Sequence, residues 1–110
     1  TSQSINLGVN VFLWRGALET IDFMPISSAD SVGGIIITDW YSTPGNQNER
    51  CKLNILISGK VLKTENLKVT SFCQDFKDQI WVSKEVDKEK NVKIENAILN
   101  KAKKLKIQSS

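Results

Sequence analysis

The sequence predicts an α+β domain in which an N-terminal helix, a four-stranded antiparallel meander sheet and a C-terminal helix follow one another, with both helices on one sheet face. Apolar residues recur at spacings of three and four near both ends of the chain, as in helices. Between residues 35 and 82 they alternate or form β-branched runs joined by short turns, as in a meander. The 110 residues fit a single domain, 1–110, in which we expect 1–4 and 107–110 to fray.

The first helix is predicted between Ile5 and Ile21. One apolar stripe has helical spacing: Leu7, Val11, Trp14, Leu18 and Ile21. A second apolar patch lies on the opposite side: Ile5, Val9, Phe12 and Leu13. A helix that is apolar on two sides is normally buried on two sides. The second patch is therefore covered either by this chain, for example by residues 23–26, or by a partner protein, a membrane or a second copy.

The central strands are predicted from β-branched content and alternation. Residues 27–34 form a polar loop ending in two glycines, and strands follow over 35–41, 50–58, 67–76 and 79–82. Pro44 and Gly45 end the first strand in a turn, which we expect to be type II with glycine at positive φ. Alternation also predicts that at most one of Trp40 and Tyr41 faces the core.

The last helix begins near Asp87, a plausible N-cap, and its apolar face consists of Ile94, Ile98, Ala102 and Leu105. Four lysines gather on a neighbouring face: Lys90, Lys93, Lys101 and Lys104. This lysine face is either an ordinary solvated helix surface or a binding surface for nucleic acid or another anionic surface. A lysine stripe without interleaved arginine or aromatic residues is weak support for nucleic-acid binding.

Cys51 and Cys73 fall on the second and third predicted strands and share the parity of apolar neighbours. They would form a cross-strand disulfide if the register brings them opposite each other. The alternative, which we adopt as the expectation, is two free thiols that pack as small apolar residues.

Composition excludes most catalytic chemistry. The chain contains no histidine, so Ser-His and Cys-His pairs are excluded, and two cysteines are too few for a zinc site. Asp39 and Glu49 flank the Pro44 turn, where a charge pair is a commoner arrangement than an acid/base site. The net charge of +3 and the presence of only two arginines argue against specific nucleic-acid recognition. We therefore expect no enzyme activity, no catalytic residues, no metal and no cofactor.

Several segments resemble an uncharacterised family of alphaproteobacterial cell-envelope proteins, catalogued as a domain of unknown function. The resemblance is carried by residues 12–20, 23–25, 28–30, 33–34, 37–41, 44–46 and 48–50. It implies a lipoprotein-type signal peptide and a periplasmic location on a lipid anchor. The chain begins at Thr1 rather than at methionine, which agrees with a removed leader. The expected architecture is also similar to the helix-grip domains of the BamC lipoprotein.

The predicted function is a non-enzymatic envelope binding or scaffold module that recognises another envelope protein or a second copy of itself. The alternative is binding of nucleic acid or an anionic surface by the lysine face, and contact with a membrane is expected only through an anchor. We expect residues 39–50 to form a rigid recognition loop in which Glu49 pairs with a cation such as Lys52. The candidate binding residues are Val9, Phe12, Trp40, Tyr41, Asn46, Asn48 and Arg50.

Overall fold

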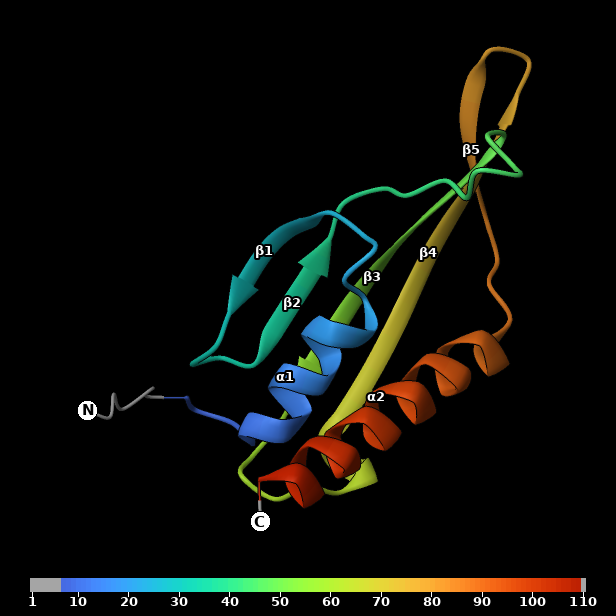
Figure 1. The fold of residues 1–110 in the computed structure, drawn as a ribbon. Coiled ribbons are helices and arrows are strands. Elements are labelled where there is room, and N and C mark those ends of the chain that lie inside the picture. The colour runs from blue at the N-terminus through green and yellow to red at the C-terminus, as the bar shows by residue number, and fades with distance from the viewer. Residues whose placement is uncertain (1–6, 110) are drawn as a thin grey trace.

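A computed structural model describes residues 7–109 and has an α+β fold (Figure 1). The elements in chain order are α1 (Val11–Thr20), β1 (Ile26–Asp30), β2 (Ile35–Thr38), β3 (Glu49–Ile57), a 3₁₀ turn (Thr64–Asn66), β4 (Leu67–Lys77), β5 (Ile80–Lys84) and α2 (Lys88–Gln108). The predicted order of helix, antiparallel sheet and helix is confirmed. The predicted fraying of residues 1–4 lies outside the described residues, whereas α2 continues as a regular helix to Gln108.

The sheet has five strands in the order β1-β2-β3-β4-β5, so the prediction of four strands was wrong. The additional strand is β1, which lies in the segment that we expected to be a polar loop. All five residues of β1 are exposed, and they show no apolar alternation. β1 is an edge strand that pairs with β2, so backbone hydrogen bonds rather than side-chain burial keep it in the sheet.

Two tight connections determine the hairpins at the two edges of the sheet. Between β1 and β2, the Asp30 carboxylate accepts hydrogen bonds from the backbone N–H groups of Val32 and Gly33. Gly34 then takes a φ of 75°, which a residue with a side chain rarely adopts. Between β4 and β5, Asp78 and Gln79 both have positive φ, as the two central residues of a type I′ hairpin turn require.

Helix α1 begins at Val11, six residues later than predicted, because Asn10 is its N-cap. The Asn10 side-chain oxygen accepts hydrogen bonds from the backbone N–H groups of Phe12 and Leu13, both at 2.9 Å. The Asn10 backbone N–H donates to the Gly59 carbonyl, and Asn10 itself has an extended backbone conformation. A capping side chain of this kind sets the helix start more strongly than apolar periodicity does.

Both helices lie on the same side of the sheet and enclose the core with it (Figure 1). They cross closely at Gly16, where an added Cβ would lie 3.0 Å from backbone atoms of Ile98 and Ala102 in α2. Helix α2 also covers the part of β4 that β5 does not pair with. There the Glu95 carboxylate accepts the Val69 backbone N–H at 2.8 Å. The helix layer therefore satisfies a free strand edge as well as burying apolar surface.

Cys51 and Cys73 form a disulfide, which contradicts the prediction of two free thiols. The antiparallel register of β3 and β4 places the two residues directly opposite each other, with their Cα atoms 4.1 Å apart. Parity in the sequence indicated the shared face, but only the register determines which residues are opposite.

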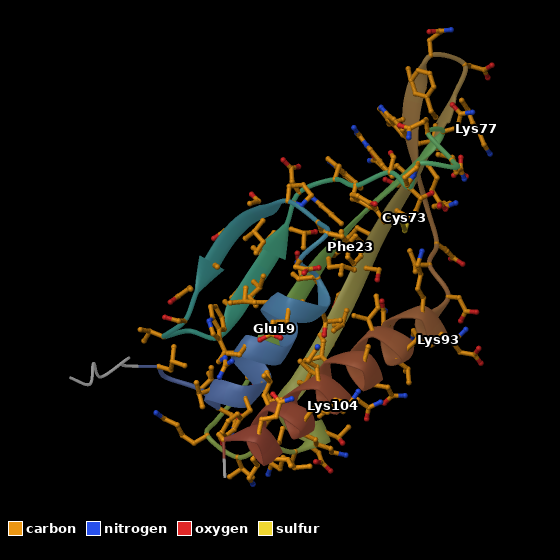
Figure 2. The ribbon with its side chains drawn as sticks, viewed as in Figure 1. Glu19, Phe23, Cys73, Lys77, Lys93 and Lys104 are labelled. Carbon is orange, nitrogen blue, oxygen red and sulfur yellow. A yellow bond between two sulfur atoms is a disulfide. The ribbon has the colours of Figure 1, made fainter. Side chains whose placement is uncertain are left out.

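The molecule is elongated, with principal extents of 54 × 26 × 22 Å. The hairpin of β4 and β5 projects past the helices, and the opposite face of the sheet has no helix layer (Figure 1). We call this helix-free side the outer face. Figure 2 shows the side chains of the projecting hairpin, near Lys77, standing apart from those packed around the helices.

Candidate functional site

Trp40 and Tyr41 lie on opposite sides of the sheet, as alternation predicted. Tyr41 packs against the core and meets the ring of Phe23 edge-on, with the ring centroids 5.2 Å apart. Its backbone forms an isolated antiparallel bridge with Cys51, which keeps the chain beside β3 after β2 has ended. Trp40 lies on the outer face, where it contacts Arg50 and Lys52. Trp40 is therefore available to a ligand, whereas Tyr41 belongs to the core side.

The most ordered feature of the outer face is a guanidinium between two indole rings. The Arg50 guanidinium carbon lies 4.5 Å from the ring centroid of Trp40 and 4.2 Å from that of Trp81. Arg50 Nε also donates a hydrogen bond of 2.8 Å to the Gln74 side-chain oxygen. We call Trp40, Arg50 and Trp81 the Trp–Arg–Trp stack. Cation–π contacts on both sides and a side-chain hydrogen bond hold the guanidinium in one position.

The stack borders a shallow depression of about 420 Å³, lined by Ile37, Trp40, Lys52, Asn54, Phe72, Gln74 and Ser83. The outward positions of the described β3 and β4 carry three cations and no carboxylate: Arg50, Lys52 and Lys68. Apolar side chains are also exposed there, among them Phe72 and Phe76. The outer face therefore combines positive charge with aromatic surface.

The loop over residues 39–50 is held by local hydrogen bonds, as predicted, but its turn differs. The Asn46 backbone N–H donates to the Thr43 carbonyl, and the Asn46 side-chain oxygen accepts the Asn48 backbone N–H. Gly45 does not have a positive φ, so the prediction of a type II turn was wrong. The Asn48 carbonyl accepts the Phe76 backbone N–H, which attaches the loop to the β4–β5 hairpin.

The carboxylate of Glu49 pairs with Lys84 and not with Lys52. Glu49 and Lys52 are three residues apart on one strand, so their side chains point to opposite faces of the sheet. Lys84 also contacts Asp75 at 2.8 Å. Hydrogen bonds to the Asp75 carboxylate, and to a smaller extent to the Glu49 carboxylate, raise the pKa of the Lys84 amine above its ordinary value of 10.5.

The predicted patch on the first helix does not form an open surface. Val9 is buried and its side chain packs close to Gly34, while Phe12 packs against the core cluster. The described residues of the second patch, Val9, Phe12 and Leu13, are therefore packed within the chain. Ile5, the remaining member of the patch, lies outside the described residues. This outcome corresponds to the alternative in which other parts of the chain cover the patch.

The lysine face of α2 is divided among different environments. Lys101 lies 3.9 Å from the Glu19 carboxylate of α1. The Lys90 amine approaches the sulfur atoms of the disulfide, at 3.8 Å from Cys51 and 4.0 Å from Cys73. The four lysines therefore do not present one uniform surface.

With this geometry established, the chain can be compared with known proteins. A family model described as a domain of unknown function, DUF3576, matches residues 7–107. The chain belongs to this family. The DUF3576 domain is 38% identical over 109 residues to the uncharacterized protein RP420 of Rickettsia prowazekii (strain Madrid E). These matches confirm the expected membership of an uncharacterised alphaproteobacterial family.

The alignment with the Rickettsia protein covers 99% of this chain and 65% of that protein, so the DUF3576 domain spans less than two thirds of its relative. No solved structure matches the chain.

Sequence reasoning missed Trp81 as part of the candidate site. In the structure, Trp81 lies opposite Phe76 and on the same face as Gln74 and Arg50. The Phe76 and Trp81 rings are in contact, with their centroids 5.0 Å apart. The exact register of the β4–β5 turn was needed to bring Trp81 to Arg50, and a shift of one residue would have reversed its face.

The described residues of the outer face carry groups that can bind a ligand. Both cysteines are in the disulfide, so neither provides a free thiol. Within residues 7–109, no cluster of three acidic or cysteine side chains has the arrangement to hold a metal ion. In the same part of the chain, neither helix is both long enough and apolar enough to span a membrane. The arrangement offers a fixed cation, aromatic surface and exposed backbone.

Proposed function

We propose that this DUF3576 domain is a non-enzymatic module of the cell envelope that binds another protein through the outer face of its sheet. The observation that carries the proposal is the Trp–Arg–Trp stack, in which a guanidinium is fixed between two half-buried indole rings. Tryptophan and arginine are the residues that most often dominate binding energy at protein interfaces.

The geometry of the stack favours binding because the guanidinium is already positioned. Among the described residues, the only hydrogen bond of the Arg50 side chain goes from Nε to Gln74, so its terminal nitrogens can donate to a partner carboxylate. A side chain that is ordered before binding loses less conformational entropy on association. The stack therefore supports recognition of an acidic group flanked by apolar or aromatic surface.

The charge and composition around the stack support the same type of partner. Arg50, Lys52 and Lys68 have no carboxylate among their outward neighbours on β3 and β4. Phe72 and Trp81 add aromatic area within the same face. The expected partner is therefore a protein surface that presents aspartate or glutamate beside apolar side chains.

One structural observation supports a location in the envelope. The Cys51–Cys73 disulfide agrees with an oxidising compartment such as the bacterial periplasm. The resemblance of the sequence to envelope proteins that carry a lipoprotein-type signal peptide favours the same location. The similarity to the helix-grip domains of BamC rests on the order and layering of elements and is part of this proposal.

The test uses a photo-cross-linking amino acid at Ser83, which lines the depression on the outer face. The same probe at Lys103, an exposed residue of α2, is the matched control. In cells that produce the protein, the Ser83 probe is expected to form a discrete adduct with another protein or with a second copy. The adduct should be lost when Arg50→Ala or Trp81→Ala is added, while each variant keeps a cooperative thermal transition.

Three results would contradict the proposal. The first is the same set of adducts from Ser83 and Lys103, which would indicate random encounters. The second is an unchanged adduct after removal of Arg50 or Trp81. The third is an adduct with nucleic acid instead of protein, which would make the outer face a nucleic-acid surface and would depend steeply on salt.

A further inference from the structure

A cleft opens on the opposite side of the sheet from the Trp–Arg–Trp stack, where the two helices differ in length. Helix α1 has 10 residues and α2 has 21, which corresponds to lengths of about 15 and 32 Å. Gly16 and Glu19 of α1 lie against the C-terminal half of α2, at residues 98–102. The N-terminal half of α2 lies over β4 but has no helix beside it, which leaves space between it and the segment after α1.

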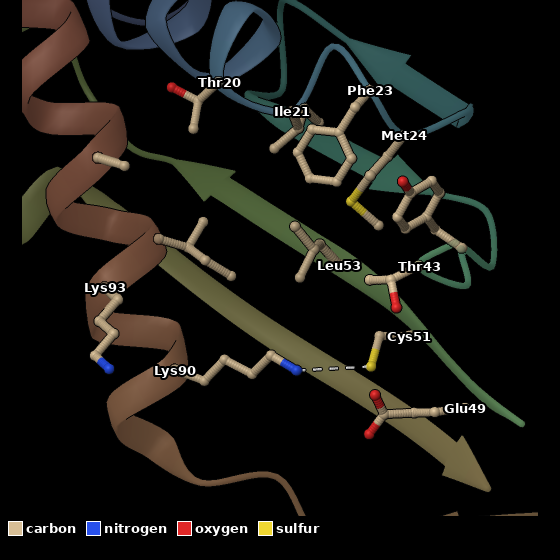
Figure 3. A pocket seen from close by; sticks show the side chains of 13 residues that line it. Thr20, Ile21, Phe23, Met24, Thr43, Glu49, Cys51, Leu53, Lys90 and Lys93 are labelled. Atoms are coloured by element: carbon tan, nitrogen blue, oxygen red, sulfur yellow. Dashed lines mark hydrogen bonds between the residues drawn. The ribbon is translucent and has the colours of Figure 1, made fainter. Parts of the chain in front are cut away.

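This cleft has a volume of about 340 Å³ and a largely apolar wall. Its lining residues are Thr20, Ile21, Phe23, Met24, Tyr41, Thr43, Glu49, Cys51, Leu53, Lys90, Lys93, Ile94 and Ala97. Figure 3 shows Phe23, Met24 and Leu53 pointing into the space between the sheet and α2. The volume lies at the lower end of the range for small-molecule pockets, which fits one narrow ligand.

The rim of the cleft carries uncompensated positive charge. Figure 3 shows the Lys90 side chain extending across the cleft toward Cys51, and its amine lies 3.8 Å from that sulfur. A disulfide sulfur is uncharged and a weak acceptor, so it does not neutralise the ammonium group. Glu49 is the only carboxylate among the described lining residues, and it pairs with Lys84.

We propose that this cleft binds one medium-chain alkyl carboxylate, a monomeric fatty acid, with its chain over Leu53, Met24 and Ile94 and its carboxylate at the Lys90 amine. Apolar lining accounts for the chain, because burying methylene groups is favourable in proportion to area. The unpaired ammonium at the rim accounts for the anionic head. The proposal is independent of the outer-face function, because no residue of the Trp–Arg–Trp stack lines the cleft.

The test titrates the 110-residue chain with decanoate below its micelle concentration and follows backbone amide resonances. We expect saturable one-to-one binding, with the largest shifts at Leu53, Ile94 and Ala97. Lys90→Gln should weaken decanoate binding about tenfold, the effect of losing one charge-assisted hydrogen bond. Lys104→Gln, an exposed lysine of the same helix outside the cleft, is the control and should leave the affinity unchanged.

Two further measurements separate the parts of the proposal. Ala97→Leu adds side-chain volume at an exposed helical residue of the lining, and it should abolish binding without loss of helix. Decanol has the same chain without the charge. It should bind more weakly than decanoate to the wild type, whereas the Lys90→Gln variant should bind decanol and decanoate with equal affinity. If Ala97→Leu does not fold, the comparison of the two ligands still decides the role of Lys90.

The proposal is overturned if decanoate causes no saturable shifts, or if decanol binds as tightly as decanoate. It is also overturned if Lys104→Gln weakens binding as much as Lys90→Gln does. Binding to phospholipid vesicles that survives Ala97→Leu, without binding of monomeric decanoate, would assign the lysines to a membrane surface instead.

Discussion

At the scale of single residues, the Cys51–Cys73 disulfide links β3 covalently to β4. The apolar parity of Cys51 and Cys73 fitted two packed thiols as well as it fitted a disulfide. The register of β3 and β4 decides between them by placing the residues opposite each other. Lys90 lies beside the two sulfurs, so the disulfide also forms part of the wall of the cleft.

We predict that replacing both cysteines with alanine lowers the free energy of unfolding by about 3 kcal/mol, because the link closes a loop with a sequence separation of 22 residues in the unfolded chain. Urea denaturation of the wild type and the double variant measures the change. Adding a reductant should destabilise the wild type alone. Intact mass spectrometry must show two hydrogens fewer in the non-reduced wild type, and equal masses with and without reductant would contradict the disulfide.

At the scale of elements, local signals placed both helices and the central strands but missed an edge strand and a helix start. β1 has no apolar alternation, because neither of its faces is buried. α1 begins after Asn10, six residues after the apolar periodicity begins, because Leu7 and Val9 are buried from a segment that is not helical. In this region the apolar residues therefore correctly indicated which side chains are buried, but they did not indicate that the backbone is not helical.

The crossing of the two helices gives a prediction at this scale. Gly16→Val should lower the free energy of unfolding by about 1–3 kcal/mol, because a Cβ at this position meets the backbone of α2 at 3.0 Å and further atoms overpack the crossing. Thermal and urea denaturation measure the effect. Gly45→Ala is the matched control and should change stability by less than about 0.5 kcal/mol, since nothing lies within 4 Å of its added Cβ. Equal stabilities of the two variants would show that the helices do not cross at Gly16.

At the scale of the whole molecule, the core is concentrated where the helices cover the sheet. The radius of gyration of 15.3 Å exceeds the roughly 13 Å typical of a compact domain of this length, because the β4–β5 hairpin extends past the helices. Most side chains of β5 are exposed, whereas the C-terminal half of β3 contributes Leu53, Ile55 and Ile57 to the core.

We therefore predict that the hairpin opens without global unfolding. Backbone amides of residues 75–84 should exchange with deuterium much faster than those of residues 53–57, because few buried apolar contacts oppose local opening. Hydrogen–deuterium exchange with mass spectrometry measures both segments in one experiment. The outer part of the hairpin carries Trp81, so a bound protein partner should slow its exchange. Equal protection of the amides of the two segments from exchange in the free protein would contradict the prediction that the hairpin opens locally.

The sequence by itself determined the α+β class, the position of α2, the central strands and the separation of Trp40 from Tyr41. These features follow from periodicities of 3.6 and 2 residues, which record the buried face of each element. The tertiary structure alone decided the disulfide, the pairing of Glu49 with Lys84, the position of Trp81 beside Arg50 and the cleft next to the shorter helix. Each of these depends on strand register or on where one element ends against another. Strand register and the relative lengths of elements relate residues that are distant in the chain. No local pattern in the sequence therefore predicts these features.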